Sequence, residues 1–194
     1  MPALYAHSRN AQGQRHELAD HSLAVADLAA CFAQPLGAPS LARALGLWHD
    51  LGKAHPDFQR YLLQAEQGHA PPRGPDHKAA GVLFALQQRL GLFALLVQGH
   101  HGGLTSPSDL QSWLADPARR QAASQALAIA QSAGLAVGHP FEHPSFLSDP
   151  LSTELFLRLL FSALVDADYL DTSLHFGGEA AAQPGAAVTL ADLW

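Results

Sequence analysis

The chain has 194 residues, 48% of them hydrophobic, which is enough for one domain with a buried core. Its formal net charge of -6 excludes a protein that holds nucleic acid through a broad basic surface. No apolar run approaches the about 20 residues that cross a bilayer, and the N-terminal segment lacks a secretion signal. We therefore expect a cytoplasmic protein without a membrane partner.

Apolar residues recur at helical spacing along most of the chain and are separated by prolines and glycines. Asp20 and Ser40 are expected to cap the first two helices. Period-two alternation never persists, so we expect no sheet and an all-α fold. The expected helices begin, in chain order, near Asp20, Ser40, Pro56, His77, Leu92, Ser108, Pro117 and Leu151.

The composition changes after Leu170, where residues 177–189 contain no large apolar residue. We expect residues 1–176 to form the domain and residues 177–194 to be a linker or tail that leads to a further domain. The single Cys31 cannot form an internal disulfide, and it lies on an apolar helix face, where we expect a buried thiol.

Metal-binding side chains are spread over the expected helices. Five histidines and two carboxylates, if brought together, would fill the first shells of two metal ions. Imidazole favours Mn, Fe, Co or Ni over Mg. A carboxylate has two oxygens and can bridge two ions, whereas an imidazole has one free lone pair, so Asp50 is the natural bridge. The candidate donors are His21, His49, Asp50, His77, His100, His101 and an aspartate of the group Asp166, Asp168 and Asp171.

The aspartates of the last helix compete for one donor position. Asp166 and Asp168 point about 200° apart on a helix and cannot both face the site. Asp171 lies on the same side as Asp168 and could orient a ligand histidine. Lys53 could neutralise a phosphate oxygen or a leaving group, or it could complement a helix dipole. The histidines of irregular segments are expected to be solvated: His7, His16, His139 and His143.

Five segments together resemble the CRISPR-associated HD nuclease, the nuclease domain of the type I interference helicase-nuclease in the HD phosphohydrolase superfamily. The likeness spans residues 16–175. It implies an HD-domain helical bundle with a dinuclear metal site. The segments are LADHSLAVADLA (18–29), WHDLGKAHPDFQRYL (48–62), DHKAAG (76–81), GHHGGL (99–104) and FSALVDADYLDT (161–172).

The resemblance also implies how the donors are shared between the ions. His21, His49, Asp50 and Asp168 would hold one ion. Asp50, His77, His100 and His101 would hold the second. Asp168 is favoured over Asp166, because the family commonly places this ligand just before an aromatic or basic residue and a leucine.

The expected function is a metal-dependent nuclease that cuts single-stranded DNA in type I CRISPR interference, an antiviral defence, with Asp50 and Lys53 as catalytic residues. The chain has no Gly-x-x-x-x-Gly-Lys-Ser/Thr phosphate loop, so the helicase is a separate subunit or lies downstream of Trp194. The expected partners are single-stranded DNA, this helicase and an RNA-guided surveillance complex.

Two alternatives remain open. One is an HD-type nucleotide phosphohydrolase acting on small substrates, against which the His100-His101 pair and the long polar insertion 105–150 argue. The other is a non-catalytic metal-binding recruitment module, against which the full set of donors argues.

Overall fold

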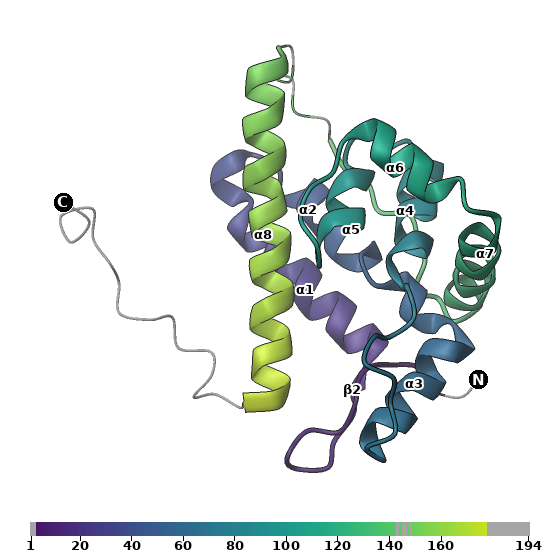
Figure 1. Cartoon of the computed structure of the whole chain (residues 1–194). Helices are drawn as coiled ribbons and strands as arrows, with labels where there is room; N and C mark the ends of the chain where they lie inside the picture. Colours follow the sequence, from purple (N-terminus) through teal and green to yellow (C-terminus); the bar gives the residue numbers. More distant parts are fainter. Residues whose placement is uncertain (1–2, 143, 145–146, 148, 178–194) are drawn as a thin grey trace.

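The computed structural model describes residues 3–142, 144, 147 and 149–177, and these form a helical bundle (Figure 1). The expected all-α fold is therefore confirmed. Two short 3-10 helices, η1 (Gln34–Leu36) and η2 (Leu51–Ala54), join the longer ones. The α-helices are α1 (Leu18–Phe32), α2 (Pro39–Trp48), α3 (Pro56–Glu66), α4 (Lys78–Gln87), α5 (Ala94–Gly99), α6 (Pro107–Leu114), α7 (Pro117–Ser132) and α8 (Pro150–Gly177).

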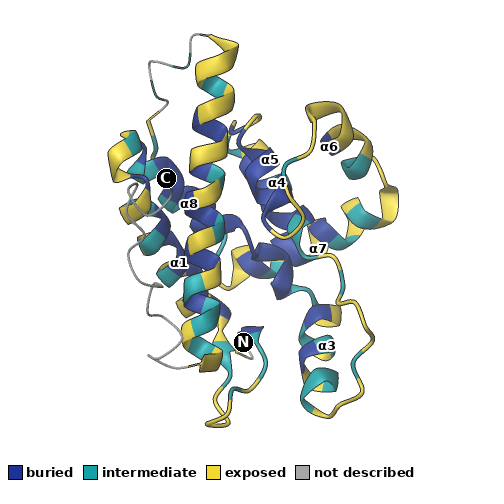
Figure 2. Ribbon diagram, turned by 60° about the vertical axis from the view of Figure 1, so that its left-hand side comes forward, coloured by how far each residue is buried: buried dark blue, intermediate teal, exposed yellow. Residues whose placement is uncertain are grey.

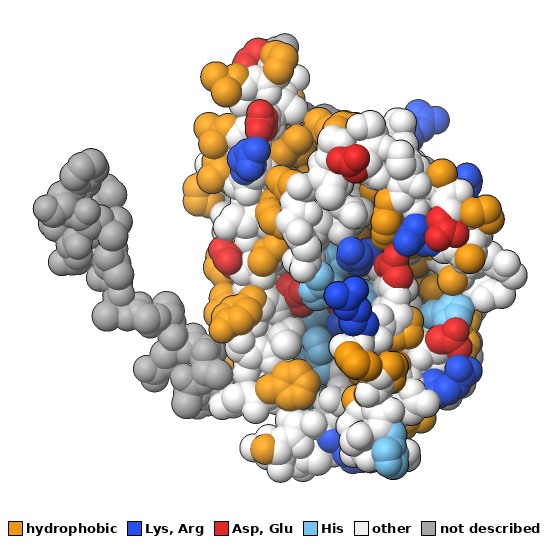
Figure 3. Space-filling view, viewed as in Figure 1, with side chains coloured by type: hydrophobic (Ala, Val, Ile, Leu, Met, Phe, Trp, Pro, Cys, Tyr) orange, Lys and Arg blue, Asp and Glu red, His pale blue; other side chains and the backbone are white. Residues whose placement is uncertain are grey.

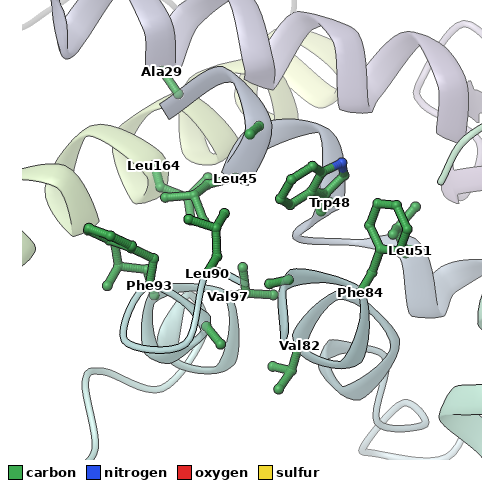
Figure 4. Close-up of a cluster of buried hydrophobic side chains, with 14 of the residues drawn as sticks. Ala29, Leu45, Trp48, Leu51, Val82, Phe84, Leu90, Phe93, Val97 and Leu164 are labelled. Carbon is green, nitrogen blue, oxygen red and sulfur yellow. The ribbon is translucent and has the colours of Figure 1, made fainter. Parts of the chain in front are cut away.

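The helices pack around a core that lies between α8 and α4. Helix α1 packs against α2 and α8, while α4 packs against α5 and α7. Helix α5 is buried throughout, whereas α8 exposes one face along its length (Figure 2). In the core, the Trp48 ring meets the edge of Phe84 at 5.1 Å, beside Leu45 and Val97 (Figure 4). This packing fixes the C-terminal end of α2, where His49 and Asp50 follow.

Local sequence explains where four of the described helices begin. Proline opens α2, α3, α6 and α7, a position where its missing N–H costs nothing. Ser106 and Asp109 form a capping box at the start of α6, and the Asp116 side chain accepts from the first turn of α7.

Two expected caps are wrong. Helix α1 begins at Leu18, so Asp20 lies inside its first turn, and α2 begins at Pro39, one residue before Ser40. Neither flanking residue, Glu17 or Ala38, makes a side-chain cap. Both helices are instead held by the packing of their apolar faces, which overrides local capping preference.

The last helix is longer than expected, since α8 continues from Leu170 to Gly177. Two polar contacts hold this extension. The His175 side chain donates to the Ser8 carbonyl at 2.9 Å, and the backbone carbonyl of His175 accepts a hydrogen bond from the Asn10 side chain. None of the described helices combines the length and the apolarity needed to span a lipid bilayer. The expected tail beyond Gly177 lies outside the described residues.

A small antiparallel hairpin corrects the expectation of no sheet. Strand β1 (Tyr5–His7) pairs with β2 (His16–Glu17), and His7 lies opposite His16. Strands this short carry too little alternation to be recognised in the sequence. The Gln59 side chain of α3 bonds both the N–H and the carbonyl of Tyr5, at 3.0 and 2.9 Å.

Cys31 also differs from expectation, because its side chain is exposed on α1. Val25 and Ala29 of the same helix are buried, so the buried face of α1 does not include Cys31. A small apolar residue next to an apolar stripe cannot be assigned to a face from spacing alone.

An ion pair fixes the hairpin to α3 and leads to a prediction on pH. The Arg15 guanidinium binds both oxygens of Glu66 at 2.7 Å, and this bond lowers the pKa of Glu66 from 4.5 to about 2. The stabilisation is therefore complete above pH 4.5 and is lost as the pH falls through about 2.

The substitution Glu66→Gln is expected to lower the free energy of unfolding at pH 7 by up to about 1 kcal/mol. The gap from wild type should shrink steadily as the pH falls below 4.5. Urea unfolding at pH 7, 5, 4 and 3 measures this, with the exposed pair member Glu154→Gln as the control. A gap that widens with acidification would contradict the assignment.

Candidate metal centre

The structure brings all seven candidate donors together, in two groups that share Asp50. Within each group, one donor atom of every residue lies within 4.8 Å of the others. The first group is His21, His49, Asp50 and Asp168. The second group is Asp50, His77, His100 and His101.

The donors come from the ends and inner faces of several helices. His21 lies in the first turn of α1 and Asp168 on α8. His49 is the C-cap of α2, and Asp50 follows it before η2. The remaining histidines come from the start of α4 and the end of α5, namely His77, His100 and His101. The bundle therefore assembles at one point residues that are far apart in the sequence.

Asp50 is fully buried and places its two oxygens toward different groups. Its Oδ2 lies 3.1 Å from Nε2 of His21 and 3.2 Å from Nε2 of His49. Its Oδ1 lies 3.5 Å from Nε2 of both His77 and His100. This is the arrangement expected of a carboxylate that bridges two ions.

Hydrogen bonds orient the histidine rings. The Nδ1–H of His49 donates to the Gly46 carbonyl at 2.7 Å, and that of His100 donates to the Val97 carbonyl at 2.7 Å. The His77 ring bonds the Pro75 carbonyl in the same way at 3.2 Å. A carbonyl can only accept, so the neutral rings carry their proton on Nδ1 and turn the Nε2 lone pair inward.

Unpaired buried atoms show that the donor set fits metal ions. Among the described residues, four of the buried side-chain atoms without a hydrogen-bond partner belong to this centre: Nε2 of His49, His77 and His100, and Oδ1 of Asp50. Leaving buried polar atoms unpaired is costly unless something binds them. Nitrogen and oxygen donors in this mixture suit divalent transition metals, so His21, His49, Asp50 and Asp168 would hold one ion and Asp50 with the other three histidines a second.

The electrostatics of the centre also favour cations. Burial alone would lower the pKa of His49, but the carboxylates of Asp50 and Asp168 raise it to about 10. Burial lowers the pKa of His77 to about 4, so this ring is neutral at pH 7. Without a metal ion, the positive charge of the first group lies on the protonated His49 ring. A metal ion that binds there must therefore displace a proton from His49.

Asp168, not Asp166, faces the centre. Its Oδ1 lies 3.4 Å from Nε2 of His21, and the side chain is almost completely buried. The His49 side chain lowers the pKa of Asp168 against the opposite effect of burial. Asp166 is exposed and accepts a hydrogen bond from Ser162 at 3.2 Å on the outside of α8.

Asp171 makes the orienting contact that its position predicts. Its Oδ2 accepts from Nδ1–H of His21 at 2.6 Å, so the Nε2 lone pair of that ring faces Asp50, on the side where a metal ion would bind. We expect Asp171→Asn to lower the affinity of the chain for Mn²⁺ about 10–100-fold, because it removes the carboxylate that fixes the ring. Calorimetric titration measures the affinity, with Asp166→Asn as the matched control. Equal affinities for the two variants would contradict this role.

Two histidines beside the centre were expected in solvent, and this is wrong. His7 and His16 lie half-buried in the hairpin, with ring centroids 4.8 and 5.3 Å from that of His21. His16 stacks on His175 at 4.8 Å. Burial lowers the pKa of His16 to about 4. Asp171 already bonds Nδ1 of His21, the ring nitrogen that does not face Asp50. We therefore place the rings of His7 and His16 beside the candidate donors and not among them. His143 lies outside the described residues.

Lys53 is buried in η2, with 3% of the residue exposed, and its Nζ lies 2.6 Å from Oδ2 of Asp50. Together with His49, this ammonium holds the pKa of Asp50 well below its ordinary value, against the opposite effect of burial. Lys53 is therefore a fixed positive charge next to the carboxylate shared by both groups.

Gly52 sets the distance between this turn and α4. A Cβ atom at this position would lie 1.9 Å from the His77 carbonyl oxygen, which is backbone and cannot rotate away. We expect Gly52→Ala to lower the free energy of unfolding by about 1–3 kcal/mol and to weaken metal binding, because it drives Asp50 from His77. Urea unfolding and calorimetry measure both effects, with Gly91→Ala, where nothing lies within 4 Å, as the control. An unchanged stability would contradict the close approach.

The comparisons with known proteins agree with this geometry. The family model described as the HD domain matches residues 18–133, more than half of the chain. This segment holds every donor except Asp168, which α8 adds. No curated protein matches the chain significantly. The chain therefore belongs to the HD-domain family, a superfamily of metal-dependent hydrolases.

Proposed function

We propose that this chain is a metal-dependent nuclease that hydrolyses phosphodiester bonds of single-stranded DNA in type I CRISPR interference. The observation that carries the hydrolytic part is the sharing of Asp50 between two donor groups. Divalent ions held there would supply a nucleophilic water at neutral pH and stabilise the attacking and leaving oxygens of a displacement at phosphorus. The DNA substrate and the CRISPR setting rest on the sequence segments that resemble the CRISPR-associated HD nuclease.

The chain's own residues have distinct parts in this reaction. Asp50 fixes both groups relative to each other through its two oxygens. Lys53 would neutralise a phosphate oxygen or the leaving oxygen, since its ammonium lies beside that carboxylate. Asp171 keeps the His21 ring in place.

Charge and accessibility support a single strand as substrate. Histidines lie near the middle of one face of the molecule, with basic side chains beside them (Figure 3). His101 is exposed, so a substrate can reach the second group from solvent. With a net charge of -6, the chain has little general attraction for duplex DNA, and we propose that a helicase domain or subunit and an RNA-guided surveillance complex deliver the strand.

A nucleotide phosphohydrolase is the second candidate. A cavity of about 290 Å³ opens beside His77 and His101, and this volume suits one nucleotide. Membership of the HD-domain family is equally compatible with a nuclease and with a nucleotide phosphohydrolase. The two functions are therefore distinguished by which substrate the chain hydrolyses.

Substrate competition tests the proposal. The chain is incubated with Mn²⁺ and a labelled single-stranded oligonucleotide, the matching blunt duplex, or a panel of nucleoside mono- and triphosphates. The proposal expects cleavage of the single strand, with Mn²⁺, Co²⁺ or Ni²⁺ more effective than Mg²⁺. EDTA should stop the reaction. Turnover of mononucleotides alone would select the second candidate, and efficient cleavage of the duplex would contradict the need for a helicase.

A further inference from the structure

We infer that the cavity beside the metal centre is a stacking subsite for one nucleotide of the DNA strand, next to the phosphate that is cut. This inference rests on the proposed function. The cavity has a volume of about 290 Å³, close to the lower limit of about 300 Å³ for small-molecule sites. It therefore has room for one nucleotide unit and not for a base pair.

One wall of the cavity belongs to the metal centre. His77 and His101 line it, and both are donors of the second group. Lys53 lines it as well, with its ammonium 2.6 Å from the shared carboxylate of Asp50. A phosphate bound at the centre would thus place its neighbouring sugar and base in this cavity.

Aromatic side chains also line the cavity. Phe58, Tyr61 and Phe176 line the cavity, from α3 and from the end of α8. Phe58 is buried, with its ring 5.9 Å from Tyr61 and 5.1 Å from His77. The rings of His77, Phe58 and Tyr61 therefore lie next to one another along the cavity.

Phe176 is 45% exposed and lies beside two other rings. Its ring meets those of His7 and His175 at 5.7 and 4.7 Å, in edge-on arrangements. Hydrophobic side chains border the histidines on this face (Figure 3). A supported aromatic ring that faces solvent at the edge of a cavity is a platform on which a base can stack.

Base stacking would also let a negatively charged chain bind a DNA strand. The net charge of -6 gives little electrostatic attraction for a polyanion, so the strand needs another source of affinity. Base stacking on aromatic rings provides it and tolerates any sequence, because every base has an aromatic face. We therefore expect the subsite to bind purine and pyrimidine nucleotides alike.

The experiment compares two substrates on several variants of the Mn²⁺-loaded full chain. One substrate is oligothymidylate and the other has the same backbone with abasic residues. The wild type should show a KM about 10-fold higher for the abasic strand. In Phe176→Ala and Tyr61→Ala the KM for oligothymidylate should rise to about the abasic value. In Phe176→Trp, which keeps an aromatic ring, this KM should stay at the wild-type value.

The matched control is Tyr169→Ala, which removes another aromatic ring of α8, one that is 69% exposed and outside the cavity. It should leave both KM values unchanged, and metal content should be equal in all variants. Equal KM values for the two strands in the wild type would overturn the subsite while leaving the nuclease intact, and this arm needs no variant to fold. Absence of strand cleavage with turnover of free nucleotides would overturn the proposed function together with the strand subsite.

Discussion

Replacing Asp50 with asparagine is expected to lower the rate of single-strand cleavage more than about 100-fold. Replacing a residue that only orients a metal ligand costs about 10–100-fold, and Asp50 is itself the candidate donor shared by both groups. Asparagine keeps the size of the side chain but loses the negative charge and one oxygen acceptor, so it bridges two cations poorly. Initial rates with Mn²⁺ measure the effect.

The control for this variant is Asp166→Asn, which changes an exposed aspartate of α8 that bonds only Ser162 among the described contacts. Its rate should match that of the wild type. Metal content should fall in the Asp50 variant at both groups. Wild-type cleavage by Asp50→Asn would show that the shared carboxylate is not part of the reaction.

Replacing Asp168 with alanine is the second change with a large expected effect. Asp168 provides the only carboxylate besides Asp50 in the first group, and it lies beside both histidines of that group, 3.4 Å from His21 and 3.7 Å from His49. We expect at least a 100-fold loss of cleavage and loss of one metal ion, because the ion would keep three of its four protein donors and lose charge.

Asp166→Ala is the direct comparison, since it removes the same side chain from the same helix two residues earlier. The ratio of the two cleavage rates measures which aspartate acts at the centre. Equal losses, or a larger loss for Asp166→Ala, would show that the sequence resemblance and the direction of Asp168 both mislead.

The helices could be predicted because they follow from local patterns, and the candidate donors were selected by their residue types and by the family resemblance. Helical spacing places His49 and Asp50 at the end of one helix, and proline marks the start of the next at Pro56. The opposed directions of Asp166 and Asp168 follow from 3.6 residues per turn. These features need no knowledge of the packed structure.

The surroundings of the donors could not be predicted in the same way. His7 and His16 reach His21 because the hairpin is held by Gln59 of α3 and by the end of α8, through contacts between residues far apart in the sequence. Such contacts leave no local pattern. The exposure of Cys31 likewise depends on how α1 is rotated against its neighbours.

The cavity shows the same limit. Phe58 and Tyr61 are separated from Phe176 by more than a hundred residues, and only the packed bundle places them around one space. Their spacing within α3 is equally compatible with core packing, which is the role that Phe58 also has.

Anomalous diffraction from crystals grown with Mn²⁺ tests the central claim most directly. We expect two peaks about 3.5–4 Å apart, one among His21, His49 and Asp168 and one among His77, His100 and His101, with Asp50 between them. A single peak, or peaks away from Asp50, would contradict a dinuclear centre bridged by this carboxylate.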